Sequence, residues 1–126
     1  MQIKFADDTT LECIQVNGRK QYYQGAERDT LEFVFAKSAG FDALDAAFAD
    51  EAKTASITII NNDVGAENPE IWVYDGYTLR MSMRMEPVVI TPGTMEAPAV
   101  TEERIMVVMA QLTYIERQLK ALGINI

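Results

Sequence analysis

The feature that most constrains the fold is a regular apolar spacing near the end of the chain, in residues 101–123. Apolar side chains recur there at alternating intervals of three and four residues, the spacing of a helix that buries one seam. The seam residues are Ile105, Val108, Leu112, Ile115, Leu119 and Leu122. Thr101 suits an N-cap and Gly123 suits a helix end. We therefore predict a long C-terminal helix over 101–123.

The sequence leaves two packing arrangements open for this seam. In one, the helix packs on the sheet of its own chain. In the other, it also packs on further copies. Residues 105–110 are apolar on every side, so that half must be covered from several directions, whereas a narrow seam continues from Gln111 onward. We therefore favour a homo-oligomer whose interface contains the six seam residues.

The chain before residue 91 has the short alternating runs of β-strands. The clearest run, residues 77–85, alternates Tyr, Leu and Met with Thr, Arg and Ser, which is typical of a strand with one buried face. Asn17-Gly18 and Asp75-Gly76 are strong signals for two-residue hairpins. Between Cys13 and Ile14 the apolar phase slips by one residue, which indicates a bulge or a strand buried on both faces.

Two further segments complete the predicted architecture. Residues 41–50 have helical spacing and form a short inserted helix. Residues 91–99 contain two prolines and a glycine and form a linker or strap. The fold class is α+β: an antiparallel β barrel or sandwich of about six or seven short strands with a short inserted helix, followed by a long C-terminal helix. We expect a β-rich body over 1–90, the linker over 91–99 and the oligomerisation helix over 100–126.

The charge of the chain argues against two classes of partner. The net charge is −8, and residues 100–126 hold three acids and three bases, so the whole −8 lies in the body. An acidic body repels phosphate backbones and anionic lipids. We therefore expect no nucleic-acid and no membrane partner. The N-terminus lacks the pattern of a signal peptide, so we expect cytoplasmic synthesis.

The residues needed for common catalytic arrangements are missing. There is no histidine, and Cys13 is the single cysteine, which we expect to be a small buried apolar residue. The acid pairs Asp7/Asp8 and Asp50/Glu51 occur at predicted turns or helix ends, although an enzyme that uses carboxylates alone stays open as a weak alternative. The oxygen-rich segment 61–68 lacks the spacing of an EF-hand. We predict a non-enzymatic protein with no metal site and no cofactor.

An aromatic face offers a different function. Trp72 and Tyr74 alternate with Ile71 and Val73, so one pair faces the core and the other is half exposed. Exposed aromatic rings stack on sugars, whereas ordinary cross-strand packing needs no ligand. The alternative function is therefore a carbohydrate- or ligand-binding β module that uses Trp72 and Tyr74.

Residues 24–35 (QGAERDTLEFVF), residues 41–59 (FDALDAAFADEAKTASITI) and the terminal heptads together carry a family likeness. The chain resembles small structural proteins, baseplate- or tail-associated, that are encoded in the tail modules of phages and prophages of Gram-positive bacteria. The resemblance implies a virion or virion-assembly role, homo-oligomeric packing and contacts with other phage tail proteins. It brings no catalytic residue with it.

Overall fold

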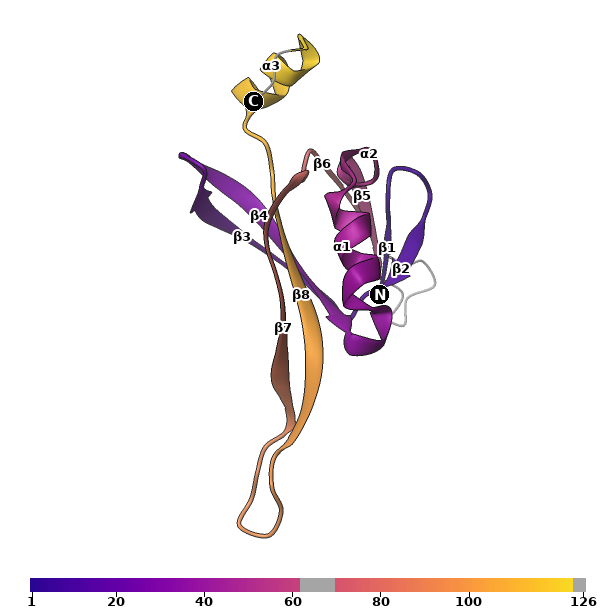
Figure 1. The fold of residues 1–126 in the computed structure, drawn as a ribbon, viewed down its shortest axis with the longest axis vertical. Coiled ribbons are helices and arrows are strands. Elements are labelled where there is room, and N and C mark those ends of the chain that lie inside the picture. The colour runs from indigo at the N-terminus through magenta and orange to yellow at the C-terminus, as the bar shows by residue number, and fades with distance from the viewer. Residues whose placement is uncertain (62–69, 124–126) are drawn as a thin grey trace.

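The computed structural model describes residues 1–61 and 70–123. These residues form two antiparallel four-stranded sheets and a few short helices, so the α+β class is confirmed (Figure 1). The sheets do not close into a barrel in the part of the chain that is described.

The first sheet has the strand order β2-β1-β5-β6. Its strands are β1 (Gln2–Lys4), β2 (Thr10–Glu12), β5 (Ser56–Asn61) and β6 (Glu70–Asp75). Ile3 of β1 lies opposite Ile59 of β5, and both side chains enter the core.

The second sheet has the order β3-β4-β8-β7. Its strands are β3 (Gln15–Tyr23), β4 (Ala26–Ala36), β7 (Leu79–Thr91) and β8 (Val100–Ala110). Phe33 of β4 pairs with Val107 of β8, which pairs in turn with Met83 of β7. β8 therefore runs through the middle of the sheet.

The chain passes from one sheet to the other at Cys13 and Ile14. The Cys13 amide donates to the carbonyl of Met1, 2.9 Å away beside β1, and the next amide, from Ile14, donates to the carbonyl of Val34 in β4 at 2.8 Å. Successive side chains of a strand point to opposite faces. The slip in apolar phase at this point therefore marks a change of sheet between β2 and β3, and the predicted bulge or doubly buried strand is wrong.

The core lies between the two sheets and one helix. That helix is α1 (Phe41–Ala49), which follows the 3-10 turn η1 (Lys37–Ala39) and precedes the single turn α2 (Glu51–Thr54). Phe48 of α1 packs on Phe5 and Phe33, with ring centroids 5.3 Å apart in each pair. Arg80 of β7 forms an ion pair with Asp45 of α1. The helix predicted over 41–50 is thus present, and it covers one side of the two sheets.

The long C-terminal helix predicted over 101–123 is wrong. Its first half is strand β8, and only α3 (Tyr114–Ala121) is helical. Residues 105–110 are all buried because β4 and β7 flank them and both faces of the strand are covered. On one face an ion pair between Arg84 and Glu32 (Nη2 to Oε2, 3.2 Å) joins the flanking strands across β8. An apolar run with this pattern fits a buried strand as well as a buried helix, and the β-branched Ile105, Val107 and Val108 favour the strand.

The two predicted hairpins are also corrected. Asn17 and Gly18 lie within β3, opposite Glu32 and Leu31, and the turn to β4 occurs at Gln24 and Gly25, which both have positive φ. Gly76 does have positive φ, at 82°, but β6 and β7 belong to different sheets. The Gly76 turn therefore transfers the chain between sheets.

The β7–β8 hairpin extends well beyond the rest of its sheet. The pairing of β4 with β8 ends at Ala36 and Arg104, whereas β7 and β8 continue to pair as far as Thr91 and Val100. Figure 1 shows this two-stranded extension projecting away from the body. We call residues 87–101 the arm. Residues 92–99 connect its two strands, so the predicted linker joins a strand to a strand.

The central position of β8 predicts that truncating two isoleucines of the β7–β8 hairpin will have very different effects on the free energy of unfolding. Ile105→Ala removes a side chain that is 0% exposed and should lower the free energy of unfolding by about 2–5 kcal/mol. The matched control, Ile90→Ala in the arm, removes one that is 45% exposed and should cost about 0.5 kcal/mol or less. Urea unfolding followed by Trp72 fluorescence measures both, and equal losses would contradict this account of β8.

Candidate functional site

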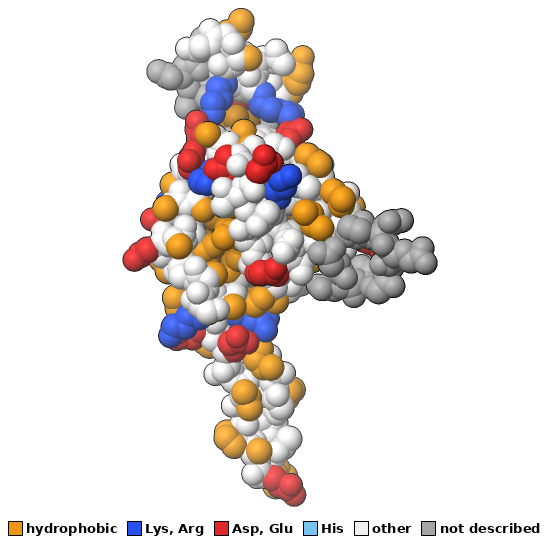
Figure 2. All heavy atoms as spheres, turned by 90° about the vertical axis from the view of Figure 1, so that its right-hand side faces the viewer, with side chains coloured by type: hydrophobic (Ala, Val, Ile, Leu, Met, Phe, Trp, Pro, Cys, Tyr) orange, Lys and Arg blue, Asp and Glu red, His pale blue; other side chains and the backbone are white. Residues whose placement is uncertain are grey.

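The outer part of the arm has an apolar surface. Val89, Ile90, Met95 and Val100 are all exposed, and Glu96 is the single charged residue between 87 and 101. Two further acids, Glu102 and Glu103, pair with Val88 and Pro87 at the base of the extension. Figure 2 shows hydrophobic side chains along the arm and an acidic group at its end. Exposed apolar side chains gathered on a projecting element are typical of a surface that contacts another protein.

A groove lies between the two sheets at the strands β3 and β6, each of which is an edge strand. Its volume is about 220 Å³. The described residues that line it are Met1, Val16, Gly18, Leu31, Ile59, Asn61, Trp72 and Tyr74. They come from both sheets, so the groove opens directly onto the space between the sheets, at the edge opposite β7.

The predicted aromatic pair belongs to this groove. Trp72 is 42% exposed, while Tyr74 is half-buried and packs edge-to-face on Tyr77 with centroids 5.7 Å apart. Ile71 and Val73 alternate with this pair and are exposed on the other face of β6. The structure therefore brings Trp72 and Tyr74 together, and binding of a ligand there stays a prediction.

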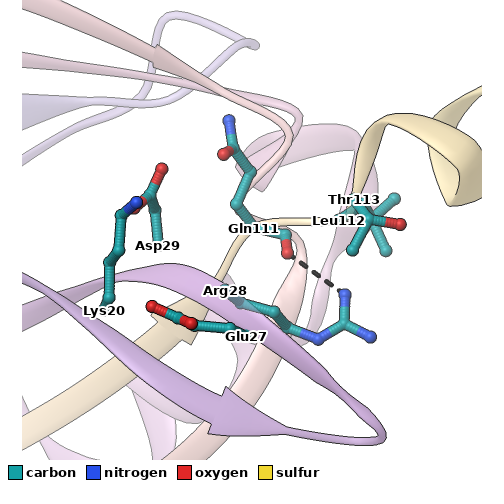
Figure 3. A pocket seen from close by; sticks show the side chains of 7 residues that line it. All are labelled: Lys20, Glu27, Arg28, Asp29, Gln111, Leu112 and Thr113. Atoms are coloured by element: carbon teal, nitrogen blue, oxygen red, sulfur yellow. Dashed lines mark hydrogen bonds between the residues drawn. The ribbon is translucent and has the colours of Figure 1, made fainter.

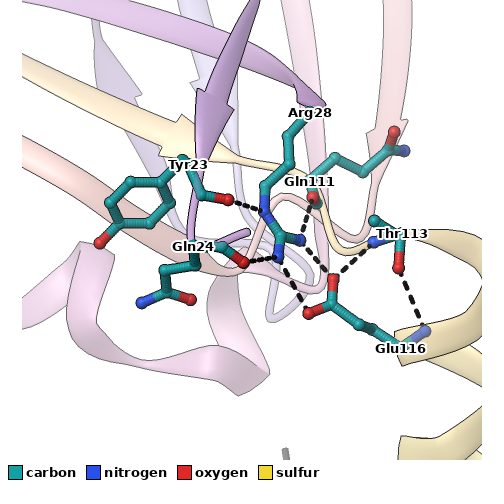
Figure 4. A network of polar contacts seen from close by, with 6 residues as sticks. All are labelled: Tyr23, Gln24, Arg28, Gln111, Thr113 and Glu116. Atoms are coloured by element: carbon teal, nitrogen blue, oxygen red, sulfur yellow. Dashed lines mark hydrogen bonds and ion pairs between the residues drawn. The ribbon is translucent and has the colours of Figure 1, made fainter. Parts of the chain in front are cut away.

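A buried arginine holds α3 against the second sheet. The guanidinium of Arg28 donates to the carbonyls of Tyr23 (2.8 Å), Gln24 (3.3 Å) and Gln111 (3.2 Å). It also forms a two-pronged ion pair with Glu116, in which Nη2 lies 2.9 Å from Oε2 (Figure 4). Glu116 is at the same time the capping-box partner of Thr113. We call this set of contacts the Arg28–Glu116 latch, because it fixes the first turn of α3 to β4.

The latch changes the acidity of its carboxylate. The Arg28 guanidinium, assisted by hydrogen bonds from Thr113, lowers the pKa of Glu116 from 4.5 to about 2. The same contact raises the pKa of Arg28. Both groups therefore stay charged near neutral pH, as a buried arginine requires.

Beside the latch lies a polar pocket of about 330 Å³ (Figure 3). The residues around it are Lys20, Glu27, Arg28, Asp29, Gln111, Leu112 and Thr113. Arg28 is already occupied by Glu116 and three carbonyls, and Lys20 lies opposite Asp29 in the β3–β4 register. The cations of this pocket thus face acids or carbonyls of the same chain, and the pocket provides no dedicated anion site.

The six predicted seam residues fall into two groups. Ile105, Val108 and Leu112 are buried within the fold of their own chain, whereas Ile115 and Leu122 are exposed and Leu119 is half-buried. Only Ile115 and Leu119 lie within α3. The exposed group, with Tyr114, leaves an apolar surface on α3, and an oligomer interface there stays a prediction.

Asp7, Asp50 and Cys13, which the sequence analysis considered for catalysis, have contacts or burial within the fold. Asp7 forms an ion pair with Lys53, which lowers the pKa of Asp7 to about 2, and Asp50 accepts a hydrogen bond from the Ala52 amide at the start of α2 (2.9 Å). Cys13 is buried, as predicted, and burial raises its thiol pKa to about 11, which makes it a poor nucleophile.

Within residues 1–61 and 70–123, the ranges that the structure describes, no group of three or more Cys, Asp or Glu side chains is placed to hold a metal ion. Most of the oxygen-rich segment 61–68 lies outside them. None of the helices described has the length and apolar character needed to cross a membrane.

Comparison with known proteins identifies no relative: no family model, no curated protein and no solved structure matches the chain. The resemblance to phage tail-module proteins therefore stays a prediction.

Two features of these surfaces had weak signals in the sequence. The single charge between residues 87 and 101 is compatible with an exposed contact arm, but also with a linker. Arg28 and Glu116 are 88 residues apart, so no local pattern links them.

The latch predicts a specific pH dependence of stability. The pKa of Glu116 is lower in the folded chain than its ordinary value of 4.5, so its stabilisation is complete above that value and is lost as the pH falls toward about 2. Glu116→Gln should lower the free energy of unfolding by about 1–3 kcal/mol at pH 7, allowing for the partial exposure of Glu116.

The deficit of Glu116→Gln relative to wild type should shrink steadily in urea titrations between pH 5 and about pH 2.5. Glu51→Gln is a suitable control, because its ion pair with Lys120 is exposed and should contribute little at any pH. A deficit for Glu116→Gln that does not change with pH would show that the latch does not act through charge.

Proposed function

We propose that the protein is a non-enzymatic structural protein that assembles with itself through protein–protein contacts. The observation that carries the proposal is the arm, a projecting hairpin with exposed apolar side chains and a single charge between residues 87 and 101, beyond the acids Glu102 and Glu103 at its base. An exposed apolar hairpin of this kind promotes aggregation unless a partner covers it.

The charge distribution supports the same function. Two bodies of net charge −8 repel each other, so a contact between copies is most favourable where the charge density is lowest. The arm is such a place. Burial of its four exposed apolar side chains would contribute on the order of 1.5–3 kcal/mol each, from which the cost of association, roughly 4 kcal/mol or more, is subtracted.

A second surface is available on α3. Tyr114, Ile115 and Leu122 are exposed, and the latch holds the helix in one position. An assembly that uses both the arm and α3 has two contacts per chain, which is sufficient to build a ring or a filament. The resemblance to tail-module proteins suggests that this assembly belongs to a phage tail or baseplate and that other tail proteins join it.

The proposal predicts an oligomer that charge on the arm disrupts. Wild type should sediment as an oligomer at micromolar concentration, and higher salt should strengthen the association by screening the acidic bodies. A double change, Val89→Asp with Met95→Asp, places two charges on exposed arm positions and should give a folded monomer.

A parallel variant, Tyr114→Asp with Ile115→Asp, separates the arm from α3, because both residues are exposed at the start of that helix. If only this second variant is monomeric, assembly uses the predicted helix interface and not the arm. A wild type that is monomeric at all salt concentrations would contradict the proposed function.

The groove favours a second candidate function, a carbohydrate- or ligand-binding module. Trp72 is partly exposed beside Tyr74 in a concave site, and an aromatic ring in a groove can stack on a sugar. Titration with oligosaccharides should then change the fluorescence of Trp72, the single tryptophan of the chain. Trp72→Phe serves as the spectroscopic control, and a signal unaffected by saturating sugars would contradict this function.

A further inference from the structure

The Arg28–Glu116 latch does more than orient α3. We infer that α3 is a separately opening unit, hinged at Thr113, and that its surface is an ordered helix only while Glu116 is bound to Arg28. The latch thereby controls whether the second contact surface of the chain is present. This consequence for assembly rests on the proposed function, whereas the hinge and the latch need no partner.

α3 does not gain its stability from burial. It has eight residues, and within Tyr114–Ala121, a range that the structure describes completely, no residue is buried. Isolated helices shorter than about 12–15 residues are marginal in water, and most helices in proteins are stabilised by an apolar face packed on a core. Tyr114 and Ile115 are each 70% exposed, so they supply little stability of that kind.

Polar contacts attach the helix to the body instead. Near its start, Glu116 accepts hydrogen bonds from the Thr113 amide and from Nη2 of Arg28, both at 2.9 Å. Near its end, Lys120 pairs with Glu51 (Nζ to Oε2, 3.0 Å), but both of these side chains are exposed, and such a pair contributes little. The Arg28 side chain is buried, so its two-pronged contact with Glu116 is the stronger attachment.

The hinge lies where the contacts of the body end. The Leu112 amide donates to the carbonyl of Gly76 at 3.0 Å, and the Leu112 side chain is buried, so the body holds the chain as far as this residue. Thr113 follows in an extended conformation, with φ −66° and ψ 164°. The Arg117 amide donates to the Thr113 carbonyl at 2.9 Å, a bond within the helix itself. Rotation at Thr113 therefore moves α3 without moving β8.

Arg28 stays in place when the latch opens. Its guanidinium also donates to the carbonyls of Tyr23, Gln24 and Gln111 (Figure 4), which lie at the β3–β4 turn and directly after β8. These three hydrogen bonds remain after Glu116 leaves. Opening thus breaks the latch but leaves the second sheet folded, as local unfolding of a terminal element requires.

Hydrogen exchange of the wild-type chain tests the hinge. The α3 amides should exchange through local opening, whereas the amides of Leu112 and β8 should exchange only through larger unfolding. We expect protection factors to fall by at least about tenfold between Leu112 and Arg117. Equal protection on both sides of Thr113 would overturn the inference, because α3 would then open only together with the body.

Glu116→Gln tests the latch itself. Glu116 is the third residue of the helix, where a glutamine retains the capping box with Thr113 but removes the charge that binds Arg28. The α3 amides of this variant should exchange within about threefold of the rate of an unstructured peptide. The Leu112 amide should remain protected, because its hydrogen bond to the body does not involve the latch.

A matched control removes the other ion pair of the helix. Glu51→Gln breaks the exposed contact with Lys120 and should leave the α3 amides as protected as in wild type. Circular dichroism verifies that each variant folds. Should Glu116→Gln not fold, Glu116→Asp, which keeps the charge and shortens its reach toward Arg28, takes its place and should also expose the α3 amides to exchange.

Sedimentation shows what opening does to assembly. The arm and α3 lie at opposite ends of the molecule (Figure 1), so Glu116→Gln leaves the arm unchanged. It should weaken association to the same extent as Tyr114→Asp with Ile115→Asp, although it alters no exposed apolar side chain. Glu51→Gln should associate like wild type.

The outcomes separate this inference from the proposed function. If Glu116→Gln leaves the α3 amides as protected as in wild type, the latch does not hold the helix, and the inference is overturned while the proposed function stands. If α3 opens but association falls only for Tyr114→Asp with Ile115→Asp, the latch does not control the surface, which also overturns it. A wild type that stays monomeric contradicts the proposed function, whereas the exchange rates decide the inference without any partner.

Discussion

The burial of β8 on both faces is the constraint on which the rest of the structure depends. Residues 105–110 pair with β4 on one side and β7 on the other, and their inward side chains join Phe33, Phe35 and Phe48 in the core. Because β8 is the central partner, it fixes where the long hairpin leaves the body and where α3 begins. β4 stops pairing at Arg104, so among the described residues the remainder of β7 and β8 pairs with no third strand and projects as the arm.

The space between the two sheets has two sides, and different elements border each of them. On one side α1 inserts Leu44 and Phe48 and is tied to β7 by the Arg80–Asp45 ion pair. On the other, β3 and β6 flank a groove in which Trp72 remains partly exposed. Edge strands expose backbone groups on their unpaired side. The same chain also projects an apolar hairpin, the arm.

Electrostatics reinforces this division of surfaces. The acidic body keeps copies apart at most orientations, whereas the arm carries one charge over residues 87–101. In the assembly that we propose, repulsion between the acidic bodies would favour contact at the arm and so contribute specificity more than affinity. Arg28, a buried cation, is already neutralised by Glu116. Its latch orients α3 and leaves Tyr114 and Ile115 exposed.

The sequence by itself determined those features that depend on residues close together in the chain. The helix over 41–50, the positive φ of Gly76 and the burial of Cys13 all follow from spacing, turn chemistry or composition. The α+β class follows from their sum. Tertiary structure decided the rest. Residues 105–110 suit a buried helix or a buried strand equally by periodicity. Pairing with β4, from Phe35 opposite Ile105 to Thr30 opposite Ala110, makes them a strand. Asn17-Gly18 reads as a turn, but its pairing with Glu32 and Leu31 extends β3 through it. The groove and the latch likewise join residues distant in sequence, and such contacts depend on a packing free energy that no local spacing encodes.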